Sequence, residues 1–452
     1  MPRKFFFRGL LVALVLTSAA FAQWHEEVLH NFRGGTDGYA PVGSVVIDAQ
    51  GNLYGATSNG GAYTCLGVGG CGVAYELSPP MNNGDPWTET ILHRFRGFAF
   101  HDGAVPEGGL TKDDAGNLYG TTAYDGTRKC SLVGGLIGCG TVYELSPPSR
   151  PDGVWTETVL YSFQGGNDGY FPWGELVLDK AGNLYGATRF GGGKGTDCGG
   201  PPYVNCGTIF ELSPAKQPGG AWTEKVLYSF AGVDAGDGAQ PNGGLTFDDA
   251  GDIYGTTWVG GTNASGCSAE GGCGTAFELA PQANGAWTEN VIYQFQGYPY
   301  DGANPNGSLI FKDNAVSGTT FSAGSPLGFG TFYSLEPSGN EWEEIIHRVF
   351  FTSHNPNSPT GGLTLTSDGT LLGTAHAGGQ NYVGAVFQLT PPRREKGWSL
   401  TNLHSFGSPP DGAAPVGGLT AGTHGEYYGV TEYGGNGSAC NGGCGTMFAV
   451  RP

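Results

Sequence analysis

The side chains best suited to chemistry lie at two positions that recur along the chain and change identity at each recurrence. The first position follows a run like Tyr-Gly-Thr-Thr, and the second follows the proline of an Asp-Gly-x-x-Pro turn. The residues at the first position are Ser58, Ala123, Arg189, Trp258, Phe321, His376 and Glu432. Those at the second are Val42, Glu107, Trp173, Asn242, Asn306, Thr360 and Val416. The flanking residues repeat and these do not, a pattern typical of a binding site grafted on a common scaffold.

Seven of these side chains form the candidate ligand-binding set. They are Glu107, Trp173, Arg189, Trp258, Phe321, His376 and Glu432. Exposed aromatic rings can stack on sugar faces, while carboxylates and amides bind hydroxyl groups. Paired carboxylates such as Glu107 and Glu432 could instead do acid and base work on a glycosidic bond. Sequence drift in solvent-exposed loops is the alternative explanation of the same variability.

No catalytic residue can be assigned from a motif, because the chain has no phosphate loop, zinc helix motif or nucleophile elbow. Four histidines share one strand position, which Tyr161, Tyr228 and Tyr293 occupy in other units. These histidines are His30, His93, His347 and His404. Interchange with tyrosine favours packing over metal ligation or base catalysis.

Six aspartates recur in the Asp-Gly turns and could form a ring of Ca²⁺ ligands. They are Asp37, Asp102, Asp168, Asp237, Asp301 and Asp411. Asp-Gly is also a common turn pair, in which the aspartate bonds to its own backbone. A feature repeated in six units favours this structural role, so we expect no cofactor and keep Ca²⁺ as the weaker alternative.

The elements that carry these positions belong to a sevenfold repeat. Seven tryptophans, spaced 55 to 68 residues apart, open similar units, and each unit contains four β-rich runs bounded by Gly, Pro, Asp or Asn. The tryptophans are Trp24, Trp87, Trp155, Trp222, Trp287, Trp342 and Trp398. This pattern predicts an all-β, seven-bladed β-propeller with four antiparallel strands per blade, and an open solenoid is the alternative.

The phase of the repeat predicts how the ring closes. After residue 23 the chain begins, at residues 24–32, with a run like the tryptophan-containing run that opens each unit. It ends, at residues 445–450, with a run like the Gly-Thr-Val-Tyr-Glu-Leu run near the end of each unit. If the Gly-Leu strand is the innermost one, the last blade lacks an outer strand, and we expect the N-terminal strand to supply it. Strands in an antiparallel blade alternate in direction, so loops that are two strands apart emerge on the same face. The Asp-Gly turns and the loops between the second and third strands should therefore share one face of the propeller.

At this point the units resemble the tandem repeats of secreted bacterial GloVer proteins. The resemblance rests on the Gly-Leu, Asp-x-x-Gly-Asn-Leu-Tyr-Gly-Thr-Thr and Gly-Thr-Val-Phe-Glu-Leu pieces, which occur in all seven units with erosion in three. It covers essentially the whole chain after the leader. It implies export, often with a C-terminal surface anchor that we do not find here, and it brings no established activity.

Ten cysteines form five close pairs, each in the glycine-rich loop between the second and third strands of a unit. The pairs are Cys65 with Cys71, Cys130 with Cys139, Cys198 with Cys206, Cys267 with Cys273, and Cys440 with Cys444. In an exported chain this spacing predicts five disulfides within loops. A metal site would need four convergent ligands, and the pairs lie on different blades.

Export is expected from the N-terminus. Arg3, Lys4 and Arg8 precede an apolar stretch, and Ala20-Phe21-Ala22 supplies a cleavage site, so residues 1–22 read as a signal peptide and residues 23–452 as one domain. The stretch is shorter than the roughly 20 apolar residues that span a membrane, and no lipid-attachment cysteine follows.

Composition narrows the classes of function. The chain has 84 glycines among 452 residues, which disfavours a helical bundle, and a net charge of -19, which disfavours nucleic acid and anionic membranes. We therefore expect a secreted, monomeric binding module for a glycan or another secreted protein. A polysaccharide hydrolase or lyase and a structural surface protein are the alternatives.

Overall fold

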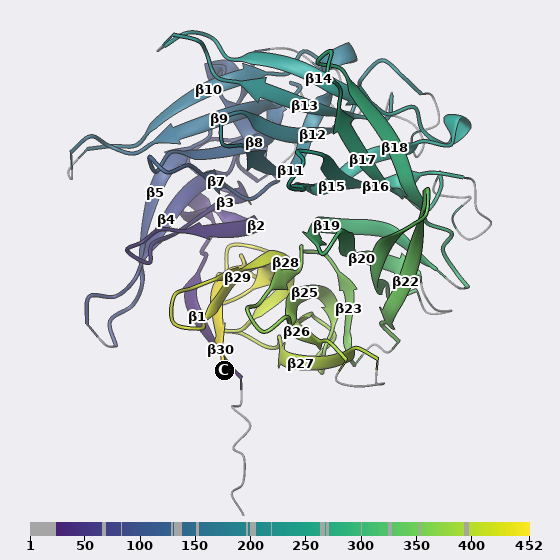
Figure 1. Ribbon diagram of the computed structural model, residues 1–452. Coiled ribbons are helices and arrows are strands. Elements are labelled where there is room, and N and C mark those ends of the chain that lie inside the picture. Colours follow the sequence, from purple (N-terminus) through teal and green to yellow (C-terminus); the bar gives the residue numbers. More distant parts are fainter. Residues whose placement is uncertain are drawn as a thin grey trace, which may run out of the picture.

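The computed structural model describes residues 24–452 apart from short stretches. These stretches are residues 66–68, 83, 128–129, 131–137, 151–152, 196–197, 199–204, 218, 263–266, 268–270, 300, 324–327, 352–353 and 393–396. The expected signal peptide, residues 1–22, lies outside the described residues. The strands form seven separate antiparallel sheets around a central axis (Figure 1), so the predicted seven-bladed propeller is confirmed.

Four blades have four continuous strands that follow chain order from the axis outward. Blade 1 contains β2 (Tyr39–Ile47), β3 (Leu53–Asn59), β4 (Val73–Ser78) and β5 (Thr88–Arg94). Blade 3 contains β11 (Tyr170–Leu178), β12 (Leu184–Phe190), β13 (Thr208–Ser213) and β14 (Thr223–Ser229). Blade 4 contains β15 (Gly238–Phe247), β16 (Ile253–Gly260), β17 (Thr275–Pro281) and β18 (Trp287–Gln294). Blade 5 contains β19 (Gly302–Lys312), β20 (Ala315–Ala323), β21 (Thr331–Ser338) and β22 (Glu341–Val349).

Blades 2 and 6 differ because their inner strand is split in two. Blade 2 contains β6 (Gly103–Pro106), β7 (Thr111–Lys112), β8 (Leu118–Asp125), β9 (Thr141–Ser146) and β10 (Thr156–Ser162). Blade 6 contains β23 (Pro356–Pro359), β24 (Thr364–Leu365), β25 (Leu371–Gly378), β26 (Ala385–Thr390) and β27 (Ser399–Ser405). In the other blades the inner strand stays continuous but shows a break in register at the same place, as between Val42 and Val46.

Blade 7 closes the ring with both ends of the chain, as predicted. It contains β28 (Gly412–Ala421), β29 (Tyr427–Gly434) and β30 (Thr446–Arg451), and β1 (His25–Asn31) is its outer strand. In Figure 1 the purple β1 lies beside the yellow β30. The pairing is antiparallel and runs from His25 opposite Arg451 to Asn31 opposite Thr446.

A collar of seven glycines, one from each blade, surrounds the axis at the break in the inner strand. These are Gly43, Gly108, Gly174, Gly243, Gly307, Gly361 and Gly417. A Cβ on Gly174 would lie 2.5 Å from the carbonyl oxygen of Gly243, and one on Gly417 would lie 2.3 Å from that of Gly43. Neighbouring inner strands therefore touch backbone to backbone, which only residues without a side chain permit.

The seams between blades are packed by one aromatic contact that recurs seven times. The aromatic residue that follows each outer strand contacts an aromatic residue on the third strand of the next blade, with ring centroids 5.0 to 5.6 Å apart and edge-to-face geometry. The pair Phe32 and Tyr75, for example, is almost completely buried. Each such pair adds about 0.5–1.5 kcal/mol to its area burial.

The loop-rich face carries the turns and the cysteine loops together, as expected. Four turns contain a short 3-10 helix: η1 (Gly35–Asp37), η2 (Phe98–Phe100), η3 (Gly166–Asp168) and η4 (Val233–Ala235). All five predicted disulfides are present, and they indicate an extracytoplasmic protein. Within the described part of the chain, no helix has the length and apolar character needed to cross a membrane.

Candidate functional site

The variable residues surround a cavity of about 690 Å³ on the propeller axis, which we call the axial cup. Side chains or backbone from all seven blades line it, and the glycine collar forms part of its wall. Five of the seven candidate ligand-binding residues belong to this lining. They are Glu107, Trp173, Arg189, Trp258 and Glu432.

The backbone before each variable residue is held by a repeated device. The residue before the turn proline has a positive φ in every blade, and its N–H donates to a loop carbonyl of the preceding blade. In blade 3, Phe171 has a φ of 62° and donates to the carbonyl of Cys139 at 3.0 Å. Pro172 and then Trp173 follow, so the loop of one blade positions the cup residue of the next.

An aromatic wall occupies blades 3 to 5. Trp173 on β11 stacks with Phe171 at 5.7 Å between centroids, and the Arg189 guanidinium on β12 lies 5.1 Å from the centre of the Trp173 ring. Trp258 on β16 contacts Phe321 on β20 at 5.5 Å. Phe321 is not part of the lining itself.

An acidic wall faces the cup from blades 2 and 7. Burial raises the pKa of Glu107 to about 8, and the charge of Glu432 adds to the effect, while Arg189 opposes it. Burial would also raise the pKa of Glu432 on β29, but hydrogen bonds from His376 and Tyr433 outweigh it, so this pKa is lowered. His376 on β25 lies outside the lining, with its Nε2 3.9 Å from Glu432 Oε2.

Glu175 is a cup residue that sequence reasoning missed. It lies two residues after Trp173 on β11 and also belongs to the lining. Its Oε1 accepts the N–H of Ser44 at 2.7 Å, so the side chain spans from blade 3 to blade 1. The sequence did carry a signal, because the other units have only glycine or serine at this position: Ser44, Gly109, Gly244, Ser308, Gly362 and Gly418.

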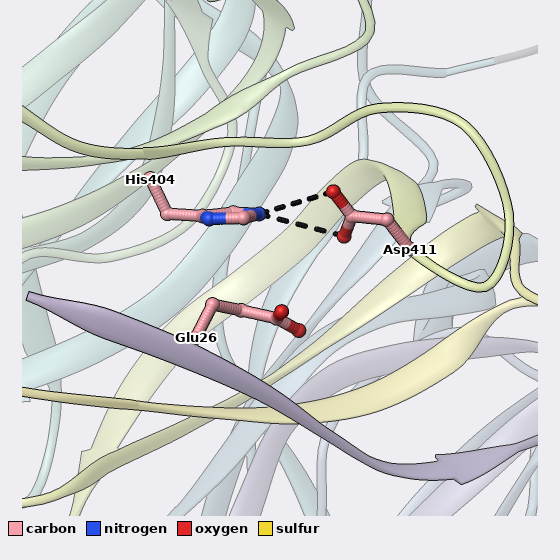
Figure 2. A group of neighbouring side chains, drawn as sticks. All are labelled: Glu26, His404 and Asp411. Carbon is pink, nitrogen blue, oxygen red and sulfur yellow. Dashed lines mark hydrogen bonds and ion pairs between the residues drawn. The ribbon is translucent and has the colours of Figure 1, made fainter.

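A second group of polar residues lies in the seams between blades. In each of six seams, the turn aspartate lies near the His or Tyr on the outer strand of one blade and near a glutamate on the outer strand of the following blade. We call these three-residue sets the seam triads. Figure 2 shows the triad of Glu26, His404 and Asp411 at the closing seam, where His404 Nε2 lies 3.2 Å from Asp411 Oδ2. Glu26 comes from the purple β1, so residues from both ends of the chain meet here.

Histidine and tyrosine make the same contact in the triads, because each lies within hydrogen-bond distance of the turn aspartate. His93 Nε2 lies 3.1 Å from Asp102 Oδ2, while the Tyr161 hydroxyl donates to Asp168 at 2.9 Å. In the remaining seam, Asn355 and Leu400 stand in place of the two acids, and His347 bonds to Ser334 at 2.8 Å instead. Both acids are thus lost together, which indicates that they act as a unit.

Burial raises the pKa of the glutamate in every triad. The values are about 7 for Glu26, Glu157, Glu224 and Glu289, about 8 for Glu344 and about 9 for Glu89. The neighbouring turn aspartate adds to the shift, and Oε1 of each glutamate is buried without a hydrogen-bond partner. At neutral pH, Glu89 and Glu344 are therefore mostly protonated, and the other four glutamates are about half protonated.

The six turn aspartates do not form a common ring of ligands. Each is engaged in its own seam: Asp237, for example, accepts the N–H groups of Ala231 and Gly238 at 2.7 and 2.6 Å. Among the described residues, three groups of His, Asp and Glu bring potential metal ligands within 4.8 Å of one another, and each contains just one turn aspartate. This geometry suits the turn role better than the Ca²⁺ alternative.

A hollow of about 780 Å³ also lies between outer strands β18 and β22. Its lining comes from the two neighbouring blades, including Asn290 and Trp342, and it contains none of the candidate residues. The axial cup is the better candidate site because it gathers residues from every blade.

The fold and the cup define a disulfide-bonded seven-bladed β-propeller with a lopsided axial pocket. Residues 267–452 match the family model of the Gloeobacter/Verrucomicrobia repeat, so the resemblance is confirmed over this part of the chain. No curated protein matches the chain.

Several solved propellers are similar in fold. An ulvan lyase from a new family of polysaccharide lyases is 10% identical, with 93% of this chain and 94% of that chain covered and a TM-score of 0.51. A putative 6-phosphogluconolactonase from Bacteroides uniformis is 14% identical, with 80% and 83% covered and a TM-score of 0.45. The PQQ-bound aldose sugar dehydrogenase from Streptomyces coelicolor is 10% identical, with 95% and 98% covered and a TM-score of 0.42. At these identities the likeness concerns the fold alone.

Proposed function

We propose that this protein is a secreted, non-enzymatic binding module whose axial cup holds the end of a glycan. The observation that carries the proposal is the contrast between scaffold and cup. The seams and the collar repeat around the ring, while the cup receives a chemically different side chain from almost every blade. A volume of about 690 Å³ also lies in the range of small-ligand sites.

A glycan fits this lining better than a protein loop does. Trp258 offers an aromatic ring to the cup, Trp173 lines it beside the Arg189 guanidinium, and three carboxyl groups belong to the same lining. Asn242 and Asn306 bond to each other at 2.9 Å and present amides to the same space. Aromatic rings combined with several hydrogen-bonding groups suit a ligand rich in hydroxyls.

A glycan panel followed by titration calorimetry tests the proposal. We expect binding without cleavage, and we expect Trp258→Ala to weaken it at least tenfold, because a stacked ring is worth about 1–3 kcal/mol or more when lost. Trp24→Ala is the matched control, since Trp24 packs on Tyr427 away from the cup. Absence of binding to any glycan would contradict the proposal and favour a structural role or a protein partner.

Cleavage of a glycosidic bond is the second candidate function, favoured by the opposite pKa shifts of the two cup glutamates. Glu107, with its pKa raised to about 8, would donate a proton to the glycosidic oxygen. Glu432, with its pKa lowered, would take a proton from the water that attacks the anomeric carbon. A reducing-end assay distinguishes the two functions: release of new ends that Glu107→Gln abolishes would establish the enzyme.

A further inference from the structure

The seam between blades 5 and 6 differs from the other six in the residue that β22 contributes. The sequence alone groups His347 with the triad histidines, but the strand register gives this place to Arg348. Arg348 lies opposite Phe332, the second residue of β21. In blade 2, Tyr161 lies in the same way opposite Val142, the second residue of β9. An arginine therefore stands where each triad has a tyrosine or a histidine.

Both carboxylates of the triad are missing from this seam. Asn355 replaces the turn aspartate, because its carbonyl accepts the N–H of Gly379 at 3.1 Å. The carbonyl of the turn residue Asp102 accepts the N–H of Gly126 at 2.9 Å in the same way. On the outer strand of blade 6, Leu400 occupies the register position of the seam glutamate. The seam thus loses two acidic groups and gains a permanent positive charge.

The guanidinium of Arg348 has no counter-charge among the described residues. Arg348 is half-buried, none of the ion pairs between described residues includes it, and its Nε is buried without a hydrogen-bond partner. In the triads the equivalent side chain lies close to a carboxylate; the Tyr228 hydroxyl, for example, donates to Asp237 at 2.9 Å. Withdrawing a cation from water without such a partner is costly, and a bound ion is one recognised reason for an unsatisfied buried group.

We propose that this seam binds an oxyanion, such as sulfate or the carboxylate of an acidic sugar, through Arg348. The anion takes the place of the two missing carboxylates. A planar guanidinium can donate two parallel hydrogen bonds to such a group. An amide at position 355 also supplies N–H donors, where an aspartate would repel the anion.

This seam site is separate from the axial cup and does not depend on glycan binding there. Neither Arg348 nor Asn355 belongs to the lining of the cup. The site lies where β22 leads into the turn before β23, and therefore on the loop-rich face. A bound oxyanion would join the end of blade 5 to the start of blade 6.

The charge of the whole chain helps to distinguish such a site from general effects of salt. A net charge of -19 repels anions, so unspecific accumulation of sulfate at the surface is suppressed. Sulfate also stabilises folded proteins by being excluded from their surfaces. That general stabilisation does not depend on one arginine, whereas binding in the seam does.

Calorimetric titration of the full chain with sodium sulfate, near neutral pH, tests the proposal. We expect saturable binding to one site. Arg348→Met keeps a long apolar side chain but removes the charge, and it should weaken binding about tenfold to hundredfold, the range for a hydrogen bond to a charged group. Arg150→Met is the matched control, because Arg150 is an exposed arginine in the connection between β9 and β10, and it should leave the affinity unchanged.

Asn355→Asp tests the same site without removing any packing. It restores a carboxylate of nearly the same shape at the turn position, so the protein supplies its own counter-charge. We expect it to abolish sulfate binding and to raise the melting temperature in sulfate-free buffer. The rise should disappear when Arg348→Met is also present, because the restored carboxylate then has no cation to pair with.

A second pair of titrations identifies the source of the oxyanion. A uronic acid oligosaccharide that binds more tightly than acetate, and loses this advantage with Arg348→Met, assigns the site to an acidic glycan. Equal affinity for the two assigns it to a free ion. Sulfate binding that survives both Arg348→Met and Asn355→Asp, or stabilisation that never saturates, would overturn the seam site. Glycan binding in the axial cup would stand or fall separately, through Trp258→Ala.

Discussion

Replacing a collar glycine by alanine should destabilise the propeller because neighbouring inner strands touch there. At Gly307, φ is +84° and a Cβ would lie 2.6 Å from the carbonyl carbon and oxygen of Gly361. Both neighbouring atoms belong to the backbone, so no side chain can rotate away. Gly369 also has a φ of +84°, but it has no atom within 4 Å of a Cβ.

The two glycines allow the cost of the contact to be isolated. A left-handed conformation costs an L-residue about 1–2 kcal/mol at either position. The change in the unfolded chain is the same for both variants and cancels in the comparison. Forcing a methyl group into a closely packed site adds about 1–3 kcal/mol at Gly307 alone. We therefore expect Gly307→Ala to lose about 2–5 kcal/mol of unfolding free energy and Gly369→Ala about 1–2 kcal/mol.

Equilibrium unfolding in guanidinium chloride, monitored by tryptophan fluorescence, measures both losses. The midpoints are compared at equal slopes, so that the difference reports stability and not a change in the denatured state. If the two variants lost the same free energy, the collar would not be in backbone contact. The packing of the inner strands and the wall of the cup would then need revision.

Three further predictions concern the seams, the closure and the loops. The seam glutamates have a higher pKa in the folded protein than the ordinary value of 4.5. Their contribution to the free energy of unfolding is therefore complete below about pH 4.5 and is lost as the pH rises to about 9. Thermal melting across this range should show the decline, and Glu89→Gln should make it less steep; a profile without any decline would contradict the protonated seam. Deleting residues 24–31 removes β1 and exposes the edge of β30, so solution scattering should show an expanded or associated particle, whereas an unchanged radius would mean that β1 does not close the ring. Replacing Cys440 and Cys444 together by serine should lower the unfolding free energy by about 2 kcal/mol, the loop-entropy value for so short a loop, and a denaturation midpoint equal to that of the parent would contradict this.

Much of the fold could be predicted because the same types of strand and turn residue recur in seven units. Regular tryptophans, turn glycines and Asp-Gly pairs located the blades, and the phase of the first and last strands predicted their pairing at β1 and β30. The disulfides were predictable because each joins residues only four to nine positions apart in one loop. The fifth unit lacks the Asp-x-x-Gly turn, yet it keeps its hairpin through Asp313 and Asn314, which both adopt positive φ.

The candidate site could be predicted only in part. Comparing units position by position found the variable residues, of which Trp173 and Trp258 line the cup. It did not find Glu175, which contacts Ser44 of another blade. It also placed Phe321 and His376 in the same set; they are not part of the cup lining but contact Trp258 and Glu432, which are.

The amino-acid sequence by itself determined the number of blades, the order of strands and the paired cysteines, because these depend on local turns and on spacing along the chain. The tertiary structure alone decided which repeated residues meet. His30 and Glu89 lie in different units, and Gly43 and Gly417 lie at opposite ends of the chain, yet ring closure brings each pair together. The charge balance of the cup is likewise a tertiary property, because its acids converge only when the blades surround one axis.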